Sequence, residues 1–446
     1  MSLGQARQAL VKRQVEPVLR RALDTFRVVV LSGPRQSGKT TLAHRIAADG
    51  AFLALDGRPL SLDGKPISLG GALLSLDDPT LAALARDDPA GFVSDRPRPT
   101  VIDEVQRGGD DLVRAIKLAV DADPVPGRFL LTGSAGFLHV PVLLESLAGR
   151  AVFFELAPFS QVEMEGGGDG LLARLLDEPR DALGGLLRSP PSALSRSQYA
   201  QRVCRGGYPE VIGLADADRQ LWFRAYVHTA VTRDIVELTG ARRSSELPRL
   251  LHAVAARTAG ELVVQDLHRD VGFGSIGTTA DYLSYLEMTH LVARLEGWAP
   301  GAATRAKRRS KIHLTDTGLA AAVLGVDAES LSDPAAAHRG PLHETFVFNE
   351  LRRQASALAP ELRFCHYRDS RGREVDLLIE RPDGRVIAVE TKAGATARPT
   401  DARWLAWLRD LIGDRFDVGI VLYTGQHPHR LSDRIGALPL SYLWKA

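Results

Sequence analysis

The segment from Gly33 to Thr40 limits the fold around it more than any other part of this chain. It reads Gly-Pro-Arg-Gln-Ser-Gly-Lys-Thr and matches the pattern GxxxxGK[ST] without a mismatch. The apolar run 27–31 comes directly before it, and a helical pattern beginning at Thr41 comes directly after it. Strand, glycine loop and helix in this order are what a phosphate-binding loop requires, and a plain glycine turn before a helix is the alternative.

In a phosphate-binding loop, backbone N–H groups surround the β-phosphate and the positive end of the next helix adds to the attraction. Lys39 is expected to meet the β- and γ-phosphate oxygens of ATP, and the Thr40 hydroxyl is expected to hold Mg²⁺. The residues that the motif and its helix offer to the nucleotide are Gly33, Pro34, Arg35, Gln36, Ser37, Gly38, Lys39, Thr40 and Thr41.

Three later positions are candidates for the chemistry of ATP hydrolysis. The apolar run 100–102 ends in two adjacent carboxylates, so Asp103 is expected to hold Mg²⁺ through water and Glu104 to polarise the attacking water. Ser134 follows the next apolar run and would place a hydroxyl near the γ-phosphate, unless it belongs to a simple turn. Arg150 is a candidate charge-stabilising arginine, with a solvated surface position as the alternative.

Length and composition limit the class of protein. A chain of 446 residues is too long for one core and predicts about two to four domains. The formal charge of +2 excludes a global polycation, and the two cysteines exclude a disulfide scaffold and a four-thiolate zinc site. No uncharged stretch reaches the roughly 20 residues of a membrane span, so we expect a cytoplasmic protein without membrane contact.

Alternating strand-like and helical runs predict a layered α/β fold for the first domain. Two segments, 52–56 and 73–77, compete for one further strand of its sheet. A glycine run near residue 166 and a stretch resembling a linker at 331–340 suggest where the chain divides. The predicted parts are an ATPase core at 1–165, a helical lid and linker at 166–243, a middle domain at 244–330 and a C-terminal α/β domain at 335–446.

The middle domain has the pattern of a winged helix. Residues 245–315 read as helix, helix, turn, helix and hairpin, with a threonine cap expected for the third helix, at 279–289. The run Arg305–Lys311 holds five basic residues in seven and could grip DNA phosphates from the hairpin. The alternatives are a solvated hairpin tip and a winged helix that serves only as a lid or a protein dock.

The C-terminal domain carries carboxylates and a lysine on two neighbouring strand patterns. Residues two apart on a strand face the same side, so Glu390 and Lys392 project together and strand pairing can bring Asp376 beside them. Glu344, on the helix before these strands, could supply a third metal ligand. Carboxylates that hold Mg²⁺, with a lysine that orients water, are the minimum for phosphodiester hydrolysis.

The order of these motifs resembles the prokaryotic AAA-type ATPases that carry a C-terminal domain of unknown function, over nearly the whole chain. The resemblance implies a P-loop core with a parallel sheet, a lid and a C-terminal domain of unknown function. From the related signal-transducing ATPase clade it implies that Pro209, in the Gly-Gly-Tyr-Pro segment, senses the nucleotide; a plain loop is the alternative. The extra stretch 57–72 departs from the pattern.

The last domain also resembles the PD-(D/E)XK nuclease fold, whose D…ExK motif and helix-borne glutamate match Asp376, Glu390, Lys392 and Glu344. The predicted function is therefore an ATP-hydrolysing protein that acts on nucleic acid, with a metal-dependent nuclease domain. The alternative is a nucleotide-switched regulator that binds DNA or protein through a nuclease-like fold that does not cut. A phosphate-loop kinase is a third class, and the sequence leaves the oligomeric state open.

Overall fold

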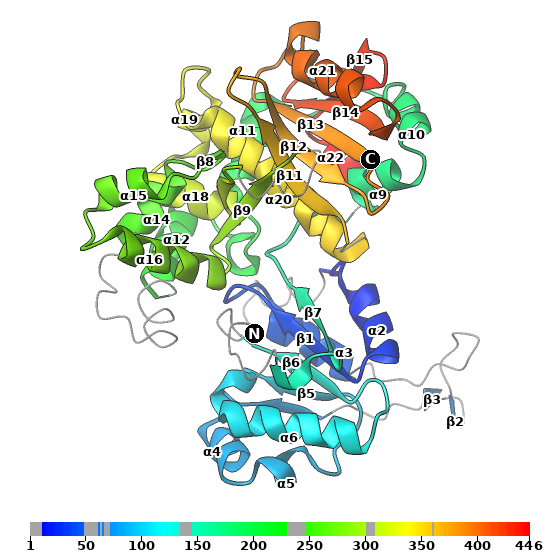
Figure 1. The fold of residues 1–446 in the computed structure, drawn as a ribbon, viewed down its shortest axis with the longest axis vertical. Helices are drawn as coiled ribbons and strands as arrows, with labels where there is room; N and C mark the ends of the chain where they lie inside the picture. The colour runs from blue at the N-terminus through cyan, green and yellow to red at the C-terminus, as the bar shows by residue number, and fades with distance from the viewer. Residues whose placement is uncertain are drawn as a thin grey trace. The chain divides into compact units, whose positions relative to one another are not determined.

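The computed structural model describes residues 11–48, 61–62, 65–66, 72–133, 145–166, 168–229, 247–299, 308–358 and 361–446. The chain divides into two compact units, Met1–Pro158 and Phe159–Ala446 (Figure 1). No helix in the described part of the chain is long and apolar enough to cross a membrane.

Unit 1 is built on a five-stranded sheet in which every neighbouring pair runs parallel, as the sequence predicts. Of the two segments that compete for one strand, 73–77 supplies it, whereas 52–56 lies outside the described residues. In spatial order the strands are β4 (Leu73–Ser75), β5 (Thr100–Asp103), β6 (Phe129–Thr132), β1 (Val28–Ser32) and β7 (Ala151–Glu155).

Helices cover both faces of this sheet, which explains why its strands read as continuous apolar runs. Val28 and Val30 of β1 pack in the cluster formed with α4, α5 and α6, while Val29 and Leu31 pack in the cluster formed with α2 and α3. The alternation follows from the two-residue period of a strand. The helices are α2 (Glu16–Thr25), α3 (Lys39–Ala48), α4 (Pro79–Asp87), α5 (Pro89–Val93) and α6 (Gly109–Ala122).

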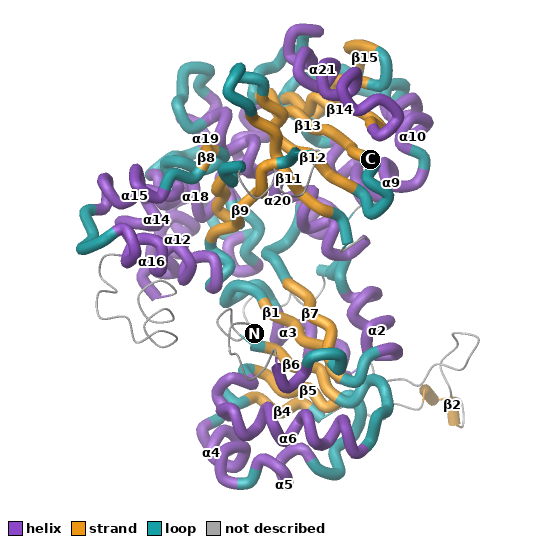
Figure 2. The backbone as a smooth tube through the Cα atoms, viewed as in Figure 1, coloured by secondary structure: helices purple, strands orange, loops and turns teal. Residues whose placement is uncertain are grey.

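Unit 2 is built on a mixed nine-stranded sheet (Figure 2). The three C-terminal strands predicted near 363–368, 374–380 and 385–391 form as β11, β12 and β13. In spatial order the strands are β15 (His429–Ser432), β16 (Ile435–Pro439), β14 (Phe416–Tyr423), β13 (Val386–Lys392), β12 (Glu374–Glu380), β11 (Arg363–Arg368), β9 (Val292–Gly297), β10 (Lys311–Leu314) and β8 (Gly260–Glu261).

The middle and C-terminal parts, predicted as separate domains, share this sheet. Strand β9 pairs in parallel with β11, through Cys365 opposite Glu296 and His366 opposite Gly297. The stretch predicted as a linker at 331–340 holds the end of one helix and the start of the next. The sequence pattern of a strand shows which residues alternate, but it does not show which distant strand is its partner.

The helices of unit 2 lie before, between and after its strands. The third helix of the middle part begins earlier than predicted, because Ser275 and not a threonine caps it by accepting from the Thr278 N–H at 3.0 Å. Within the described residues the helices include α8 (Gln161–Glu165), α9 (Gly170–Asp177), α10 (Pro179–Leu186), α11 (Arg196–Arg205), α12 (Asp216–Thr229), α14 (Leu247–Ala255), α15 (Val264–Val271), α16 (Ile276–Met288), α18 (Thr317–Leu324), α19 (Ala328–Ser332), α20 (Arg339–Leu358), α21 (Arg403–Ile412) and α22 (Tyr442–Lys445).

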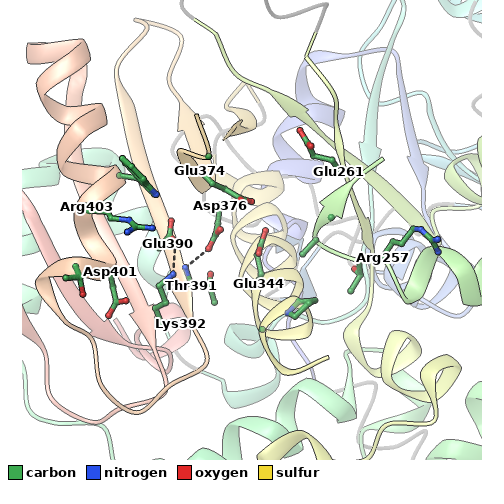
Figure 3. A pocket seen from close by; sticks show the side chains of 18 of the residues that line it. Arg257, Glu261, Glu344, Glu374, Asp376, Glu390, Thr391, Lys392, Asp401 and Arg403 are labelled. Carbon is green, nitrogen blue, oxygen red and sulfur yellow. Dashed lines mark hydrogen bonds and ion pairs between the residues drawn. The ribbon is translucent and has the colours of Figure 1, made fainter. Parts of the chain in front are cut away.

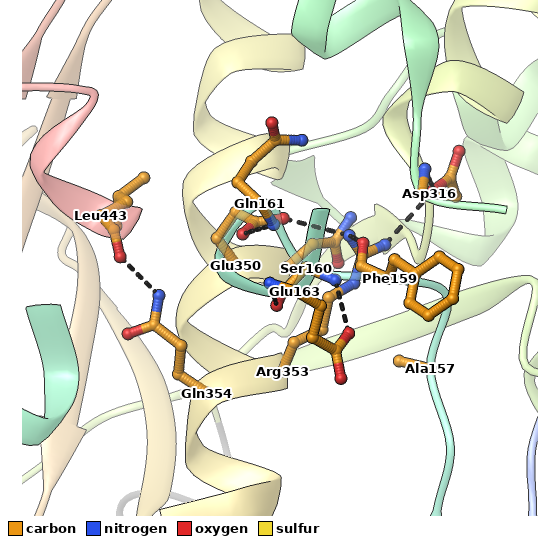
Figure 4. Close-up of polar contacts among 12 residues, drawn as sticks. Ala157, Phe159, Ser160, Gln161, Glu163, Asp316, Glu350, Arg353, Gln354 and Leu443 are labelled. Carbon is orange, nitrogen blue, oxygen red and sulfur yellow. Dashed lines mark hydrogen bonds and ion pairs between the residues drawn. The ribbon is translucent and has the colours of Figure 1, made fainter. Parts of the chain in front are cut away.

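Helix α20 holds the first residues of unit 2 through a buried polar network (Figure 4). The Glu350 carboxylate accepts from the Gln161 N–H at 2.7 Å and from the Arg353 guanidinium at 3.1 Å. Arg353 also donates to the Phe159 carbonyl at 3.0 Å. The chain that enters unit 2 is therefore fixed to this helix by hydrogen bonds and an ion pair.

The same arginine reaches a second segment. Arg353 donates to the Thr315 carbonyl at 2.9 Å and to the Asp316 carboxylate at 3.3 Å. Asp316 in turn accepts from the Gly207 N–H at 2.8 Å, and the Gly207 carbonyl accepts from the Phe159 N–H at 2.7 Å. One helix thus positions both the entry to unit 2 and the Gly-Gly loop that precedes Pro209.

Replacing Arg353 by Met should lower the free energy of unfolding of unit 2 by about 3–5 kcal/mol, because it leaves the buried Glu350 and Asp316 without their cation. All five tryptophans lie in unit 2, so their fluorescence during urea unfolding reports on this unit. Arg180→Met, at an exposed position of α10, is the control and should leave the midpoint unchanged. Equal midpoints for the two variants would contradict the role of the network.

The pH dependence of stability should carry the signature of Glu350. Burial raises the pKa of Glu350 to about 7, although Arg353 acts in the opposite direction. Between its ordinary pKa of 4.5 and about 7, the folded state keeps a proton that the unfolded chain releases, so the free energy of unfolding falls as the pH rises. The stability difference between the wild type and Glu350→Gln should decline across this window, and a constant difference would refute the assignment.

Candidate functional site

The phosphate loop lies between β1 and α3, where strand and helix form as the sequence predicts. Gly33 has φ +150°, and a Cβ added there would lie 2.3 Å from the Leu156 carbonyl oxygen, so no other residue fits. Gly38, the last loop residue before α3, has φ +95°. The two glycines of the motif are therefore required by the shape of the backbone itself.

Lys39 is buried, and its ammonium donates to the carbonyls of Gly33 and Pro34 at 2.9 Å each. The Ser37 hydroxyl is also buried and finds no hydrogen-bond partner in the described part of the chain. A nucleotide phosphate would supply that partner, so the loop fits the predicted ligand.

Arg13 supports this loop, and sequence reasoning missed it. Its guanidinium donates to the Ser37 carbonyl at 2.8 Å and to the Ala157 carbonyl at 2.6 Å. These two hydrogen bonds tie the loop to the end of unit 1. One arginine in an amphipathic segment gives no signal in the sequence, because nothing local distinguishes it from a solvated one.

Asp103 is buried at the end of β5, beside the loop. The Thr40 hydroxyl lies 3.2 and 3.1 Å from its two carboxylate oxygens, so the two predicted Mg²⁺ ligands meet. Thr132 also hydrogen bonds to Asp103, and the Ser75 hydroxyl lies 3.4 Å from it. Thr132 and Ser75 end the strands on either side of β5, and the sequence does not single out Ser75.

Glu104 follows Asp103 in a left-handed conformation, with φ 54° and ψ 45°. Such a conformation costs a residue other than glycine about 1–3 kcal/mol, and it occurs often at functional sites. The Gln106 side chain donates to the Glu104 carboxylate. Glu104 lies at the carboxyl end of its strand, the edge at which the phosphate loop also follows β1, and its role in polarising water stays a prediction. Ser134 lies outside the described residues.

Arg150 lies away from the phosphate loop of unit 1, and its role as a charge-stabilising arginine stays a prediction. Arg150 precedes β7, so it lies at the amino end of the parallel strands, whereas the phosphate loop lies at their carboxyl end. Its guanidinium donates to the Asp121 carboxylate at 2.9 Å, and this hydrogen bonding holds the pKa of Asp121 below its ordinary value.

Pro209 begins a short 3-10 helix, Pro209–Val211, in unit 2. The preceding Tyr208 is fully buried and packs against Trp222 and Tyr226, with ring centroids 5.6 and 4.9 Å away. This packing gives the Gly-Gly-Tyr-Pro segment a fixed place in its own unit. The role of Pro209 as a nucleotide sensor stays a prediction.

The four predicted C-terminal residues line one cavity of about 830 Å³ in unit 2 (Figure 3). Glu344 comes from α20, Asp376 from β12, and Glu390 and Lys392 from β13. Strands β12 and β13 are paired antiparallel through Leu377 and Val389, which brings the start of β12 beside the end of β13. The sequence therefore identified residues that do lie together, although they come from three elements.

Each of the two strand acids has a specific partner. Asp376 accepts from the Thr391 N–H at 2.8 Å, and the Lys392 ammonium donates to Glu390 at 2.8 Å. Burial and the negative charge of Asp376 raise the pKa of Glu390 to about 8, with Lys392 acting in the opposite direction. Burial and neighbouring carboxylates therefore destabilise additional negative charge in this cavity.

A second lysine lies among these acids, at a position that the sequence analysis did not predict. Lys311, expected in an exposed basic run, is fully buried. Its ammonium lies 2.6 Å from Glu344, 2.8 Å from Glu374 and 3.8 Å from Asp376. The first residues of the basic run, 305–307, lie outside the described residues.

The charges in this cluster stabilise one another. Burial alone would lower the pKa of Lys311, but Glu344, Asp376 and Glu374 together hold it above its ordinary value. Burial alone would raise the pKa of Glu374, but the Lys311 ammonium holds it below its ordinary value. Burial raises the pKa of Glu344 well above its ordinary value, and the charge of Asp376 adds to this.

The predicted metal-ligand set of Glu344, Asp376 and Glu390 is not arranged to hold an ion. Within the described residues, no group of three or more His, Cys, Asp or Glu side chains has such an arrangement. The physical reason is visible in the cluster, since Lys311 already provides a positive charge between the carboxylates. These residues as they stand do not fit a divalent metal.

Comparison with known proteins supports the assignment of unit 1. An AAA domain matches residues 25–165, and two domains of unknown function, DUF8612 and DUF4143, match 196–330 and 339–443. Uncharacterized proteins of Mycobacterium bovis and Mycobacterium tuberculosis are each 30% identical to this chain over 434 residues, which is 96% of this chain and 83% of theirs. The chain belongs to the family of these two proteins.

Among solved structures, a Walker-type ATPase of Pyrococcus abyssi is similar over 71% of this chain and 97% of its own, with 17% identity and a TM-score of 0.35. The match to the AAA domain and the parallel five-stranded sheet agree with each other. Unit 1 of this family member is therefore an AAA-type P-loop ATPase domain, as its phosphate loop predicts.

Lys39→Ala should reduce ATP hydrolysis by about 10²-fold or more, because the charge that meets the β- and γ-phosphates is lost. ATP affinity, measured by titration calorimetry, should fall in the same variant while the thermal unfolding of unit 1 changes little. Lys117→Ala on α6 is a matched control for the loss of a lysine. Normal hydrolysis by Lys39→Ala would show that the loop does not serve the nucleotide.

Proposed function

We propose that this protein is an ATP-driven switch whose second unit binds nucleic acid without cutting it. In unit 1, Lys39 would neutralise the β- and γ-phosphates, and Glu104 would polarise the attacking water. Thr40 and Asp103 supply the oxygen ligands that Mg²⁺ prefers, and they lie within hydrogen-bond distance of each other. The bound ion would offset the charge that develops on the transferred phosphate.

The observation that carries the nucleic-acid part is a small basic cavity beside the large one. It measures about 260 Å³ and is lined by Arg308, Arg309 and Arg368, and Glu261 lines both cavities. Arginine forks match the geometry of phosphate oxygens better than lysine does. The three arginines outnumber the two acids of this cavity, Glu261 and Asp369, so the cavity is suited to a phosphate of a nucleic-acid backbone.

Two of these arginines are held in place by their surroundings. Arg308 donates to the Arg368 carbonyl at 2.6 Å, and its guanidinium lies 5.7 Å from the centre of the Tyr367 ring. His366 donates to the Arg309 carbonyl at 2.9 Å, and burial lowers the pKa of His366 to about 4, so the imidazole is neutral. The segment that ends the basic run is thus anchored to β11 before any ligand arrives.

The order of elements in the middle part supports the winged-helix prediction. Helices α14, α15 and α16 are followed by the antiparallel pair β9 and β10, and β8 completes a three-stranded set with them. In such a domain the hairpin and the third helix are the parts that meet DNA. Arg308 and Arg309 lie at the base of this hairpin.

A metal-dependent nuclease is the second candidate. It is favoured by the common cavity of Asp376, Glu390 and Lys392, which is the constellation that the sequence predicts. It is disfavoured by Lys311, whose ammonium lies where the carboxylates would need a metal ion. Cleavage assays on single-stranded, double-stranded and branched DNA with Mg²⁺ and Mn²⁺ separate the two candidates.

The experiment that tests the proposal is DNA binding as a function of salt and nucleotide. Replacing Arg308, Arg309 and Arg368 by Ala should weaken binding and flatten its salt dependence, by roughly 0.9 units of log–log slope per lost phosphate contact on duplex DNA. Arg180→Ala on α10 is the control. ATP should change the affinity of the wild type but not of Lys39→Ala.

Two results would contradict this function. A folded triple variant with an unaltered salt slope would mean that the three arginines do not contact phosphate. Equal DNA affinity with and without ATP in the wild type would mean that ATP binding to unit 1 does not change DNA binding by unit 2. In that case the ATPase assignment of unit 1 would stand alone.

A further inference from the structure

We infer that Lys311 is the resident cation of the C-terminal carboxylate cluster, and that it excludes a divalent metal ion from Glu344, Glu374 and Asp376. The inference concerns metal binding alone and does not rest on nucleic-acid binding. It assigns to Lys311 a place beside three acids that line the cavity, which the basic-run pattern of the sequence would not suggest.

The lysine and its acids come from different parts of the chain. Lys311 is the first residue of β10, whereas Glu344 comes from α20, and Glu374 and Asp376 come from β12. The ammonium is within 2.8 Å of two carboxylates and 3.8 Å from the third. A single buried positive charge thus serves three negative charges that would otherwise repel one another.

The backbone of Lys311 is fixed on both sides. It pairs with Leu295 of β9 and with Glu261 of β8, so the residue lies in the middle strand of a three-stranded set. Its side chain is 1% exposed. Withdrawal of the ammonium would therefore require either unpairing of β10 or leaving an uncompensated charge in the interior.

A fourth acid that lines the cavity, Glu390, is paired with a lysine of its own, Lys392. Each of the four carboxylates therefore lies near an ammonium group, and a divalent ion among them would meet two positive charges at short range. This pairing of carboxylates with ammonium groups fits a cavity that is stable without metal. It also explains how the D…ExK pattern can be present without a metal site.

The inference predicts that removal of one charge creates a metal site. Methionine has nearly the length of lysine without its charge, so Lys311→Met leaves Glu344 and Asp376 without this cation, while Arg368 stays 3.5 Å from Glu374. We expect the full-length Lys311→Met chain to bind one Mn²⁺ that the parent does not bind. An Asp103→Asn background, free of nucleotide, removes the oxygen ligand of unit 1 from the measurement.

Bound Mn²⁺ is counted by electron paramagnetic resonance, and its effect on stability is measured as the shift in melting temperature with Mn²⁺ concentration. The parent should show neither, and Lys311→Met should show both. A further Asp376→Asn substitution should remove them again. Lys445→Met, at an exposed lysine of the same unit, is the control and should behave as the parent.

One Mn²⁺ bound by the parent and lost on Asp376→Asn would overturn the inference. So would a folded Lys311→Met chain that gains no Mn²⁺. If Lys311→Met does not fold, the parent titration decides alone, since binding there overturns the exclusion and its absence supports it. DNA binding is measured without Mn²⁺, so failure of one proposal leaves the other open.

Discussion

Unit 2 depends on the buried ion pairs of one helix. Towards its amino end α20 carries Glu344, which pairs with Lys311, and farther along it carries Glu350 and Arg353, which hold the first residues of the unit. Charges in the interior are stable only when each is compensated, so these contacts fix β10, α20 and the entering chain relative to one another. The cavity and the entry to the unit are built on the same element.

In the C-terminal cavity, the residue types match those of a hydrolytic site, but the positive charge beside them does not. Asp376, Glu390 and Lys392 have the identity and the neighbourhood of a hydrolytic site, yet the cation among the acids is an amino group of the chain. A binding function needs shape and charge, whereas cleavage would need an ion that Lys311 opposes. Glu374 of β12 and Lys311 of β10 lie outside the D…ExK motif. They therefore affect the chemistry of the cavity more than the motif does.

Unit 1 presents the opposite case, because its functional residues are local in the sequence. The loop glycines are dictated by backbone geometry, and Thr40 and Asp103 meet because parallel strands bring their carboxyl ends to one edge of the sheet. That rule applies directly to strands recognised in a sequence. The same rule places Arg150 at the opposite edge of the sheet, because the residue lies before its strand and not after it.

The sequence by itself determined the strand–loop–helix of the ATPase, the three C-terminal strands and four of the residues that line the cavity. Periodicity, glycine geometry and motif spacing are short-range properties, because residues close together in the sequence determine them. Only the tertiary structure decided that β9 joins β11 in one sheet, that Arg13 supports the phosphate loop and that Lys311 is buried among acids. Those outcomes depend on which distant segments pack together, and the free energy of that packing is a property of the whole unit.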